Sequence, residues 1–387
     1  MNSKPISIYI HIPFCKTRCG YCDFLTFACN DNMYEPYKNA LIKEIRANTA
    51  LKNYTINSIF IGGGTPTILP PSFILEILEA VATFNISKNA EITIEANPGT
   101  LSLSYLRALR ESGINRLSIG LQAWQNSLLK KIGRNHNLHD FLKNYNRARR
   151  LGFNNINVDL IFSLPYIKTE KKAFKYWVDT VRNVVSLYPE HISVYSLIIE
   201  EKTPFFREYE KGNLIPQSQE ADRHMYHFAI KYLQKKGYNH YEISNFATKN
   251  KECYHNLAYW QRKEYISFGL GAHSFINSNR TRNLSNLKNY LTILKNEDYF
   301  SIQIIEETTP ITKKDAMEEF MYLGLRCIKG ISILDFEREF KTNIYNVFSE
   351  PIKNNLDKGL LEINNNRIYL TNYGLDISNM VMSQFLL

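Results

Sequence analysis

The sequence is poor in cysteine and lacks both a long apolar run and an apolar leader, and each shortage removes a class of protein. Six cysteines in 387 residues are too few for a disulfide-rich secreted scaffold. No segment reaches the apolar length that crosses a bilayer, and the residues before Ile6 do not read as a signal peptide. We therefore expect a protein of the reducing cytoplasm, whose hydrophobic content of 44% is that of a globular protein.

Motifs for binding RNA or DNA are also missing, although the chain carries a net charge of +10. Runs of basic residues usually cover the solvated faces of helices. An excess of positive charge also suits an anionic membrane surface or a ligand that carries carboxylates. Nucleic acid is therefore not an expected partner.

Three of the six cysteines lie within eight residues. Cys15, Cys19 and Cys22 form a C-x3-C-x2-C pattern directly after the β-branched run Ile6–Ile12. An iron–sulfur cubane normally takes four cysteines, so three thiolates on one loop would leave one iron with an open position. Zinc with His11 as a fourth ligand is the weaker alternative, because structural zinc sites use a second cysteine pair that is missing here. The other cysteines stand alone, as small buried hydrophobes do: Cys29, Cys253 and Cys327.

Short β-branched runs alternate with amphipathic segments over the first half of the chain. Apolar residues recur at helical spacing between these runs, for example at Ile74, Ile77 and Val81. Six strand-then-helix units in succession predict a parallel α/β sheet that curls into an incomplete barrel with helices on one face. We expect the strands at Ile6–Ile12, Ser58–Ile61, Glu91–Ala96, Arg116–Leu121, Asn155–Phe162 and His191–Ile199.

Polar residues stand where the predicted strands end. The glycine-rich run Gly62–Thr67 follows the second strand, and Glu95 ends the third. Gln122 ends the fourth strand, and Asp159 lies in the fifth. Any one of them alone fits a capping or loop residue, but functional groups of such sheets gather at the C-terminal strand ends. Together they predict the wall of a pocket.

Beyond residue 200 the regular alternation of predicted strands and helices ends. We expect a barrel over residues 1–200 and a mixed α/β extension over residues 201–308. The extension contains the aromatic run HNLAYW, His255 to Trp260. A histidine beside tyrosine and tryptophan fits either a hydrogen-bonded surface residue or an axial ligand of haem iron, and the residues alone leave both open.

The last segment, residues 309–387, has a different pattern. Helical periodicity covers residues 313–325 and 333–340, and a further helix is expected at residues 352–358. A hairpin is expected around Asn365. Helices followed by a small hairpin predict a winged-helix-like domain, which does not by itself indicate a function.

The cysteine loop and its surroundings resemble a known superfamily. The motif YIHIPFC-x3-C-x-YC resembles that of the radical S-adenosylmethionine superfamily, in its coproporphyrinogen-dehydrogenase-like branch. Further segments match the same branch in order: GGGTPT, IEANP, RLSIGLQ, GRNH and NVDLIFSLP. The resemblance implies a partial (β/α)6 barrel in which Cys15, Cys19 and Cys22 hold a [4Fe-4S] cluster whose open iron takes S-adenosylmethionine. It implies these residues as contacts of S-adenosylmethionine: Tyr9, Gly63, Gly64, Thr65, Glu95, Gln122, Arg134 and Asp159.

A second resemblance concerns the middle of the chain. YEISNFA followed by HNxxYW is similar to the HemW-type haem chaperones, in which HNxxYW is the haem-binding signature. The resemblance implies that haem is bound by His255, Asn256, Tyr259 and Trp260. It also implies acceptor haemoproteins as partners, with the cytoplasmic membrane surface as one place of transfer and a homodimer as one form of the chain.

The alternative is an enzyme of porphyrin biosynthesis from the same branch. The oxygen-independent coproporphyrinogen III dehydrogenases remove two propionate carboxyls, and they carry a further cysteine two residues after the third. Phe24 stands at that position here. This difference and the HNLAYW run favour the chaperone, and they leave open whether any radical reaction is retained.

Overall fold

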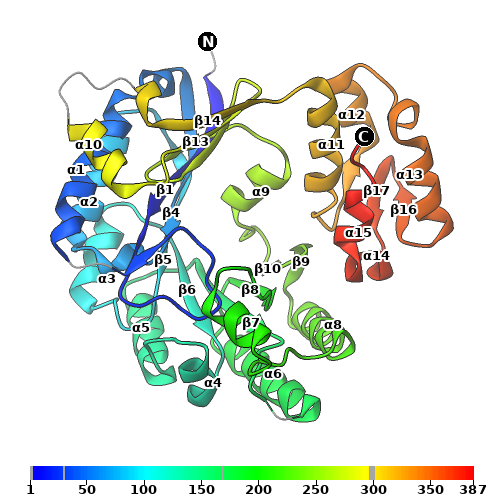
Figure 1. The fold of residues 1–387 in the computed structure, drawn as a ribbon, viewed down its shortest axis with the longest axis horizontal. Coiled ribbons are helices and arrows are strands. Elements are labelled where there is room, and N and C mark those ends of the chain that lie inside the picture. Colours follow the sequence, from blue (N-terminus) through cyan, green and yellow to red (C-terminus); the bar gives the residue numbers. More distant parts are fainter. Residues whose placement is uncertain (1–2, 29–30, 168, 296–300) are drawn as a thin grey trace.

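The computed structural model describes residues 3–28, 31–167, 169–295 and 301–387, so Cys29 lies outside the described residues. In this part of the chain one 12-stranded sheet carries helices along its outer side, and a small second unit follows at the C-terminus (Figure 1). The predicted fold class is confirmed: the protein is α/β, with a partial barrel of mostly parallel strands and a separate C-terminal domain.

The centre of the sheet is parallel. Strands β1, β4, β5, β6, β7 and β8 pair in parallel in chain order, and each is one of the six predicted strands. From one edge to the other the strands are β14 (Ile305–Pro310), β13 (Asn279–Asn283), β12 (His273–Ile276), β11 (Tyr265–Phe268), β1 (Lys4–Ile12), β4 (Tyr54–Gly63), β5 (Ile86–Ala96), β6 (Arg116–Gln122), β7 (Ile156–Phe162), β8 (His191–Ser196), β10 (Asn245–Ala247) and β9 (Asn239–Glu242).

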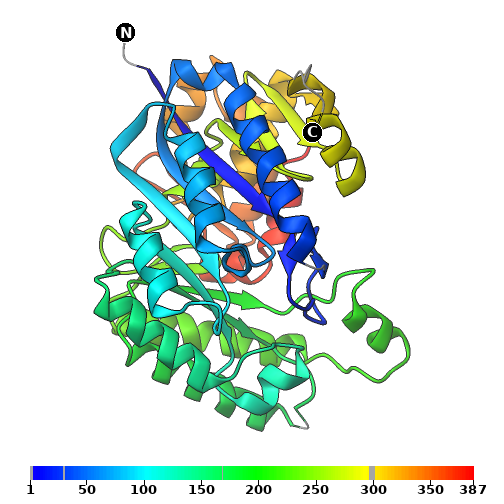
Figure 2. The ribbon, with the colours of Figure 1, turned by 90° about the vertical axis from the view of Figure 1, so that its left-hand side faces the viewer.

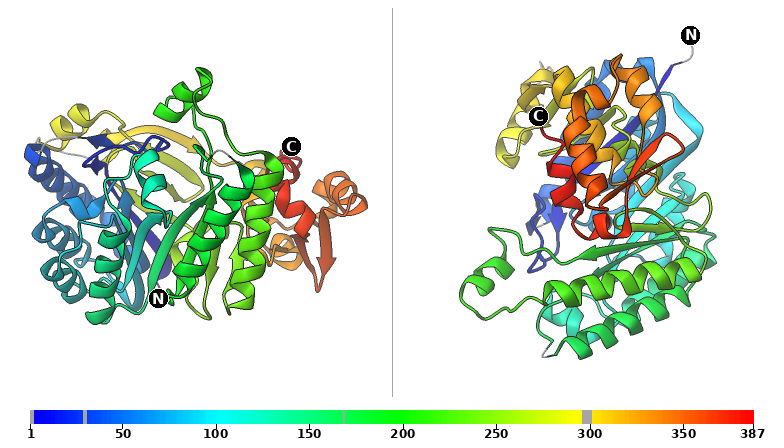
Figure 3. Two further views of the ribbon diagram at one scale, coloured as in Figure 1. Left: turned by 90° about the horizontal axis from the view of Figure 1, so that it is seen from below. Right: turned by 90° about the vertical axis from the view of Figure 1, so that its right-hand side faces the viewer.

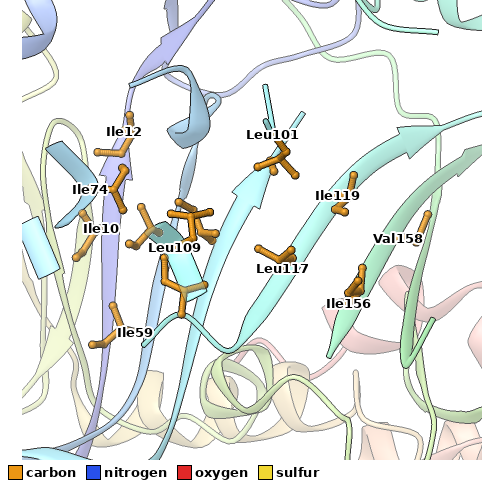
Figure 4. Packing of buried hydrophobic residues seen from close by; sticks show 14 of the residues in the cluster. Ile10, Ile12, Ile59, Ile74, Leu101, Leu109, Leu117, Ile119, Ile156 and Val158 are labelled. Atoms are coloured by element: carbon orange, nitrogen blue, oxygen red, sulfur yellow. The ribbon is translucent and has the colours of Figure 1, made fainter. Parts of the chain in front are cut away.

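Helices cover one face of this sheet, as Figure 2 shows along the side of α1 and α2. They are α1 (Tyr34–Ala47), α2 (Pro71–Val81), α3 (Leu103–Glu111), α4 (Asn126–Lys131), α5 (Leu138–Arg150), α6 (Glu170–Val185) and α8 (Gln219–Lys235). Alternate strand residues such as Ile10, Ile59, Leu117 and Val158 point toward these helices and are fully buried (Figure 4). Because side chains alternate along a strand, the residues between them face the inside of the barrel, the lumen.

The predicted extension does not form a separate sheet. Its strands β9 and β10 continue the barrel sheet at the β8 edge, and β11 pairs in parallel with β1 at the other edge. Strand β11 ends at Phe268, because Gly269 and Gly271 directly after it adopt positive φ. Helix α10 (Leu287–Lys295) packs on α1, and the boundary at residue 200 stays a prediction.

The C-terminal unit has a hydrophobic core of its own around Phe336, Phe348 and Phe385. The hairpin turn at Asn365 and Asn366 has two positive φ angles, as a tight two-residue turn requires. The expected helix at residues 352–358 begins earlier than predicted, at Tyr345. The elements are α11 (Lys313–Gly324), β15 (Ile331–Ser332), α12 (Ile333–Phe340), α13 (Tyr345–Asp357), β16 (Leu361–Asn364), β17 (Arg367–Leu370), α14 (Asn372–Asp376) and α15 (Ser378–Ser383).

Hydrogen bonds and ion pairs join this unit to the barrel sheet. Residues 326–328 continue the edge of β9: the amide of Ile243 donates to Arg326 O at 3.0 Å, and the amide of Ile328 donates to Tyr241 O at 3.0 Å. Glu319 of α11, whose side chain is 5% exposed, pairs with Arg262 at 2.9 Å. Figure 3 shows the unit beside the sheet edge. None of the helices described is long and apolar enough to cross a membrane.

Candidate functional site

The three motif cysteines lie on a loop that leaves the C-terminal end of β1. Cys15 ends the short strand β2 (Phe14–Cys15), which pairs with β3 (Phe27–Ala28). The amide of Cys22 donates a hydrogen bond to Cys19 O at 3.3 Å and closes a turn between these two cysteines. Two groups contact the sulfurs: Thr65 Oγ1 lies 3.7 Å from Cys15 Sγ, and Arg134 Nη1 lies 3.6 Å from Cys19 Sγ. Burial raises the pKa of Cys15.

These contacts fit a thiolate-bound cluster, since hydroxyl and guanidinium donors stabilise negative sulfur. In the part of the chain that the structure describes, no three Cys, His, Asp or Glu side chains are arranged to share one metal ion. His11, the fourth ligand that zinc would need, uses both ring nitrogens elsewhere. Its Nε2 lies 2.9 Å from Leu25 O and its Nδ1 lies 3.0 Å from the hydroxyl of Tyr9.

The loop is held from outside by α7 (Pro204–Glu210), which stands away from the barrel (Figure 3). The amide of Phe205 donates to Gly20 O at 2.9 Å, and its ring packs on Tyr21. A side chain on Gly20 would start 2.4 Å from the Phe205 ring. Glycine between the second and third cysteines therefore lets α7 cover the loop.

The glycine-rich run after β4 packs directly against the cysteine loop. The amide of Gly64 donates to Ile12 O at 2.8 Å, and that of Thr65 donates to Phe14 O at 2.8 Å. A Cβ on Gly64 would lie 2.5 Å from Phe14 O and 3.0 Å from Cys15 Sγ. Gly63 has a φ of 113°, which a residue with a side chain rarely adopts. The glycines are therefore needed for the close approach of the two loops.

Two predicted polar residues beside these loops, Gln122 and Arg134, each have a buried polar atom with no hydrogen-bond partner among the described residues. Arg134 Nη2 donates to Gly120 O at 2.9 Å and also contacts Asn97 Oδ1, and its Nε is the atom that finds no partner in this part of the chain. Gln122 bends back with a φ of 70°, and its Oε1 is likewise buried and unpaired. Unsatisfied buried polar atoms are costly and mark a place where a polar ligand fits.

Two carboxylates lie in the wall next to them. Glu95 accepts a hydrogen bond from the amide of Gly63 at 3.1 Å, and burial, with the charge of Asp159, raises the pKa of Glu95 to about 7. Asp159 accepts from Ser118 at 3.0 Å and Asn157 at 2.8 Å, and burial raises its pKa. A positively charged ligand would favour the ionised form of both.

The HNLAYW run forms the short helix α9 (Tyr254–Trp260), which lies against the inside of the barrel. Glu91 of β5 holds its N-terminus: the amides of Tyr254 and His255 each donate to this carboxylate at 3.2 Å. Arg116, 2% exposed, lies 4.0 Å from the same carboxylate. The buried charge pair thus fixes the first turn of α9 to the barrel.

His255 is enclosed by the barrel strands. Its Nδ1 lies 3.0 Å from Ser58 Oγ, its Nε2 lies 3.0 Å from the hydroxyl of Tyr259, and its ring packs on Phe60 with centroids 5.1 Å apart. Burial, with the nearby charge of Arg116, lowers the pKa of His255 to about 3. The imidazole is therefore neutral and 1% exposed.

A cavity of about 180 Å³ inside the barrel joins the two groups of predicted residues. Tyr9, Glu95 and Asp159 line it from the strands, and His255, Asn256 and Tyr259 line it from α9. Gly63, Gly64, Thr65 and Gln122 lie at or just after the ends of β4 and β6 instead, and Arg134 lies in the segment between α4 and α5. Trp260 lines a different space, a groove of about 1180 Å³ between α9, β9 and the C-terminal unit.

The polar lining of the lumen was not predicted from the sequence. Arg116, Asn157 and His191 are fully or nearly fully buried, and His191 Nδ1 lies 2.6 Å from Asn157 Oδ1. Central parallel strands usually read as continuous apolar runs. Polar residues at alternate positions in β6, β7 and β8 were the available signal.

Comparison with known proteins assigns the class first. Residues 9–175 match the radical SAM superfamily and residues 311–377 match the HemN C-terminal domain. The solved structure of Escherichia coli coproporphyrinogen III oxidase (HemN), described as a radical SAM enzyme, superimposes with a TM-score of 0.85 at 24% identity, over 99% of this chain and 90% of that one. The fold is therefore the radical SAM fold.

Relatives in sequence narrow the assignment. The heme chaperone HemW of Bacillus subtilis (strain 168) is 37% identical over 98% of this chain and 99% of its own length. The heme chaperone HemW of Lactococcus lactis is 35% identical over 100% of this chain and 99% of its own. The chain belongs to the HemW family of radical SAM proteins.

Proposed function

We propose that this protein is a haem chaperone that binds haem and passes it to acceptor haemoproteins, and that it carries a [4Fe-4S] cluster and S-adenosylmethionine in its barrel. The full-length relatives support this proposal by name. Transfer takes place in the cytoplasm, with acceptors at the membrane surface among the partners, and a homodimer is one form of the protein.

The cofactor residues are those of the two packed loops and the strand ends. Cys15, Cys19 and Cys22 hold the cluster, and S-adenosylmethionine on the open iron supplies one-electron chemistry when bound. Gly63 and Gly64 let the backbone of their loop lie directly beside the cysteine loop, because a Cβ at either position would meet other atoms of the protein. The positive charge of S-adenosylmethionine meets the buried carboxylates, and its carboxylate meets a buried guanidinium. The ligand residues are Tyr9, Gly63, Gly64, Thr65, Glu95, Gln122, Arg134 and Asp159.

The observation that carries the chaperone over the enzyme is the similarity to two heme chaperones over nearly the whole of each chain, at 37% and 35% identity. Phe24, where the enzymes have cysteine, is 63% exposed on the cluster loop.

The test uses protein whose cluster has been reconstituted without oxygen. Titration with ferric haem should produce a saturable Soret band, and the loaded protein should transfer haem to an apo-haemoprotein. The same preparation, with S-adenosylmethionine and a reductant, should leave coproporphyrinogen III unchanged. Decarboxylation at a catalytic rate without haem binding would establish the enzyme instead.

A further inference from the structure

Helix α9 lies between the cavity inside the barrel and the groove beside the C-terminal unit, and either space could take haem. We infer that the macrocycle lies in the groove between α9, β9 and the C-terminal unit, against Trp260 and with Cys327 facing the iron, while His255 anchors α9 inside the barrel. This inference rests on the proposed function. It departs from the expectation that His255 ligates the iron.

The environment of His255 supports an anchoring role. Both ring nitrogens have partners at 3.0 Å, in Ser58 and Tyr259. The amides of the same turn are held by Glu91, whose charge lies next to Arg116. To reach an iron outside the lumen, the imidazole would have to give up all these contacts and uncover a buried ion pair.

The groove on the other side of α9 has the size that a porphyrin needs. Its volume of about 1180 Å³ exceeds the roughly 300–1,000 Å³ typical of pockets for small organic ligands. Leu257 and Trp260 of α9 form one wall, and Phe320 and Ile331 of the C-terminal unit form the other. A flat apolar ring system fits between such walls.

The charges along the groove match a ring with two carboxylates. Five basic side chains line it, against three acidic ones: Arg262, Lys263, Lys329, Arg338 and Arg367 against Glu252, Asp335 and Glu339. Two of the acids are already paired, Asp335 with Arg338 and Glu339 with Arg262. Among the described residues, Lys263 and Lys329 enter no ion pair, which leaves them to meet the propionates of haem.

Trp260 is the member of the HNLAYW run that reaches this groove. The guanidinium of Arg326 lies 4.3 Å from the centre of its ring. Its indole Nε1 is buried and has no hydrogen-bond partner among the described residues. A buried indole N–H normally finds an acceptor, and a ligand carboxylate is one.

Three groove residues carry atoms that bind haem iron, and two of them point elsewhere. His240 Nε2 lies 3.3 Å from Ile243 O, and its ring stacks on Phe246. The hydroxyl of Tyr241 lies 2.8 Å from His191 in the lumen. No hydrogen bond is seen to the sulfur of Cys327 in the described part of the chain. Ferric iron would take this sulfur as thiolate, with release of the thiol proton to water and no change of oxidation state.

The first experiment titrates ferric haem into reconstituted full-length protein and four variants. Cys327→Ser should lose the Soret band of a thiolate ligand, and Trp260→Leu should weaken haem binding by about tenfold, which is about 1.4 kcal/mol. His255→Asn, which keeps a partner for Ser58, should leave the wavelength of the Soret band unchanged, because the imidazole is not the iron ligand. Trp124→Leu is the matched control for loss of a tryptophan outside the groove. Cluster content shows that each variant is folded.

A second experiment uses surface changes that do not disturb the core. The double variant Lys263→Glu and Lys329→Glu should bind haem about tenfold more weakly than wild type, yet bind haem dimethyl ester, which lacks free carboxylates, with equal affinity. Loss of the Soret band in His255→Asn, with unchanged binding by Cys327→Ser, Trp260→Leu and the double lysine variant, would overturn the groove site. Absence of haem binding by wild type would overturn the proposed function itself.

Discussion

Glu95 should lower the stability of the ligand-free protein, and Glu95→Gln should remove this cost. Burial and the charge of Asp159 raise its pKa from 4.5 to about 7. Between these two values the native state keeps a proton that the unfolded chain has released. Stability therefore falls as pH rises from about 4.5 to 7, and the loss is complete above pH 7. A shift of this size corresponds to about 3 kcal/mol.

Glutamine keeps an acceptor for the amide of Gly63 and cannot ionise, so the variant should gain stability only at the higher pH. The thermal midpoint of the barrel, with the cluster bound and without S-adenosylmethionine, is compared at pH 5 and pH 8. At pH 8 the variant should melt about 5 °C higher, and at pH 5 the two midpoints should agree within about 1 °C.

Two further measurements complete this test. Exposed Glu111 provides the control, since Glu111→Gln removes a surface carboxylate from helix α3 and should change neither midpoint. S-adenosylmethionine should bind at least tenfold more weakly to Glu95→Gln, because its cation loses a partner. Equal or lower stability of Glu95→Gln at pH 8 would refute the conclusion that burial and the charge of Asp159 raise the pKa of Glu95.

Three other outcomes are expected. Replacing all three loop cysteines by alanine should abolish iron and sulfide binding on anaerobic reconstitution, whereas Cys327→Ser should retain both. Gly63→Val, whose Cβ would start 2.4 Å from the His11 ring, should blunt the response of the reduced cluster's electron paramagnetic resonance spectrum to S-adenosylmethionine. Glu91→Ala should lower the free energy of unfolding by about 3 kcal/mol, because it leaves Arg116 buried without its partner, and a loss below about 1 kcal/mol in a denaturant titration would contradict the clamp on α9.

Much of the barrel could be predicted because its information is local. Period-two and helical patterns lie within single elements, so strands such as β6 and helices such as α12 (Ile333–Phe340) were expected close to their observed ends. The cysteine spacing and the glycine-rich run are likewise short motifs. Their packing against each other follows from the parallel sheet, which brings the C-terminal strand ends to one edge.

The sequence by itself therefore determined the radical SAM fold class, the cysteine loop and the polar strand ends. Only the tertiary structure decided where the HNLAYW helix lies. Its contacts join residues far apart in the chain: His255 meets Ser58 across 197 positions and Glu91 across 164. Such contacts depend on the closure of the whole sheet and on which side chains face the lumen. Local periodicity contains no information about either. His255 therefore fitted both a surface residue and a haem ligand in the sequence, and the structure shows it as a buried residue that lines the lumen.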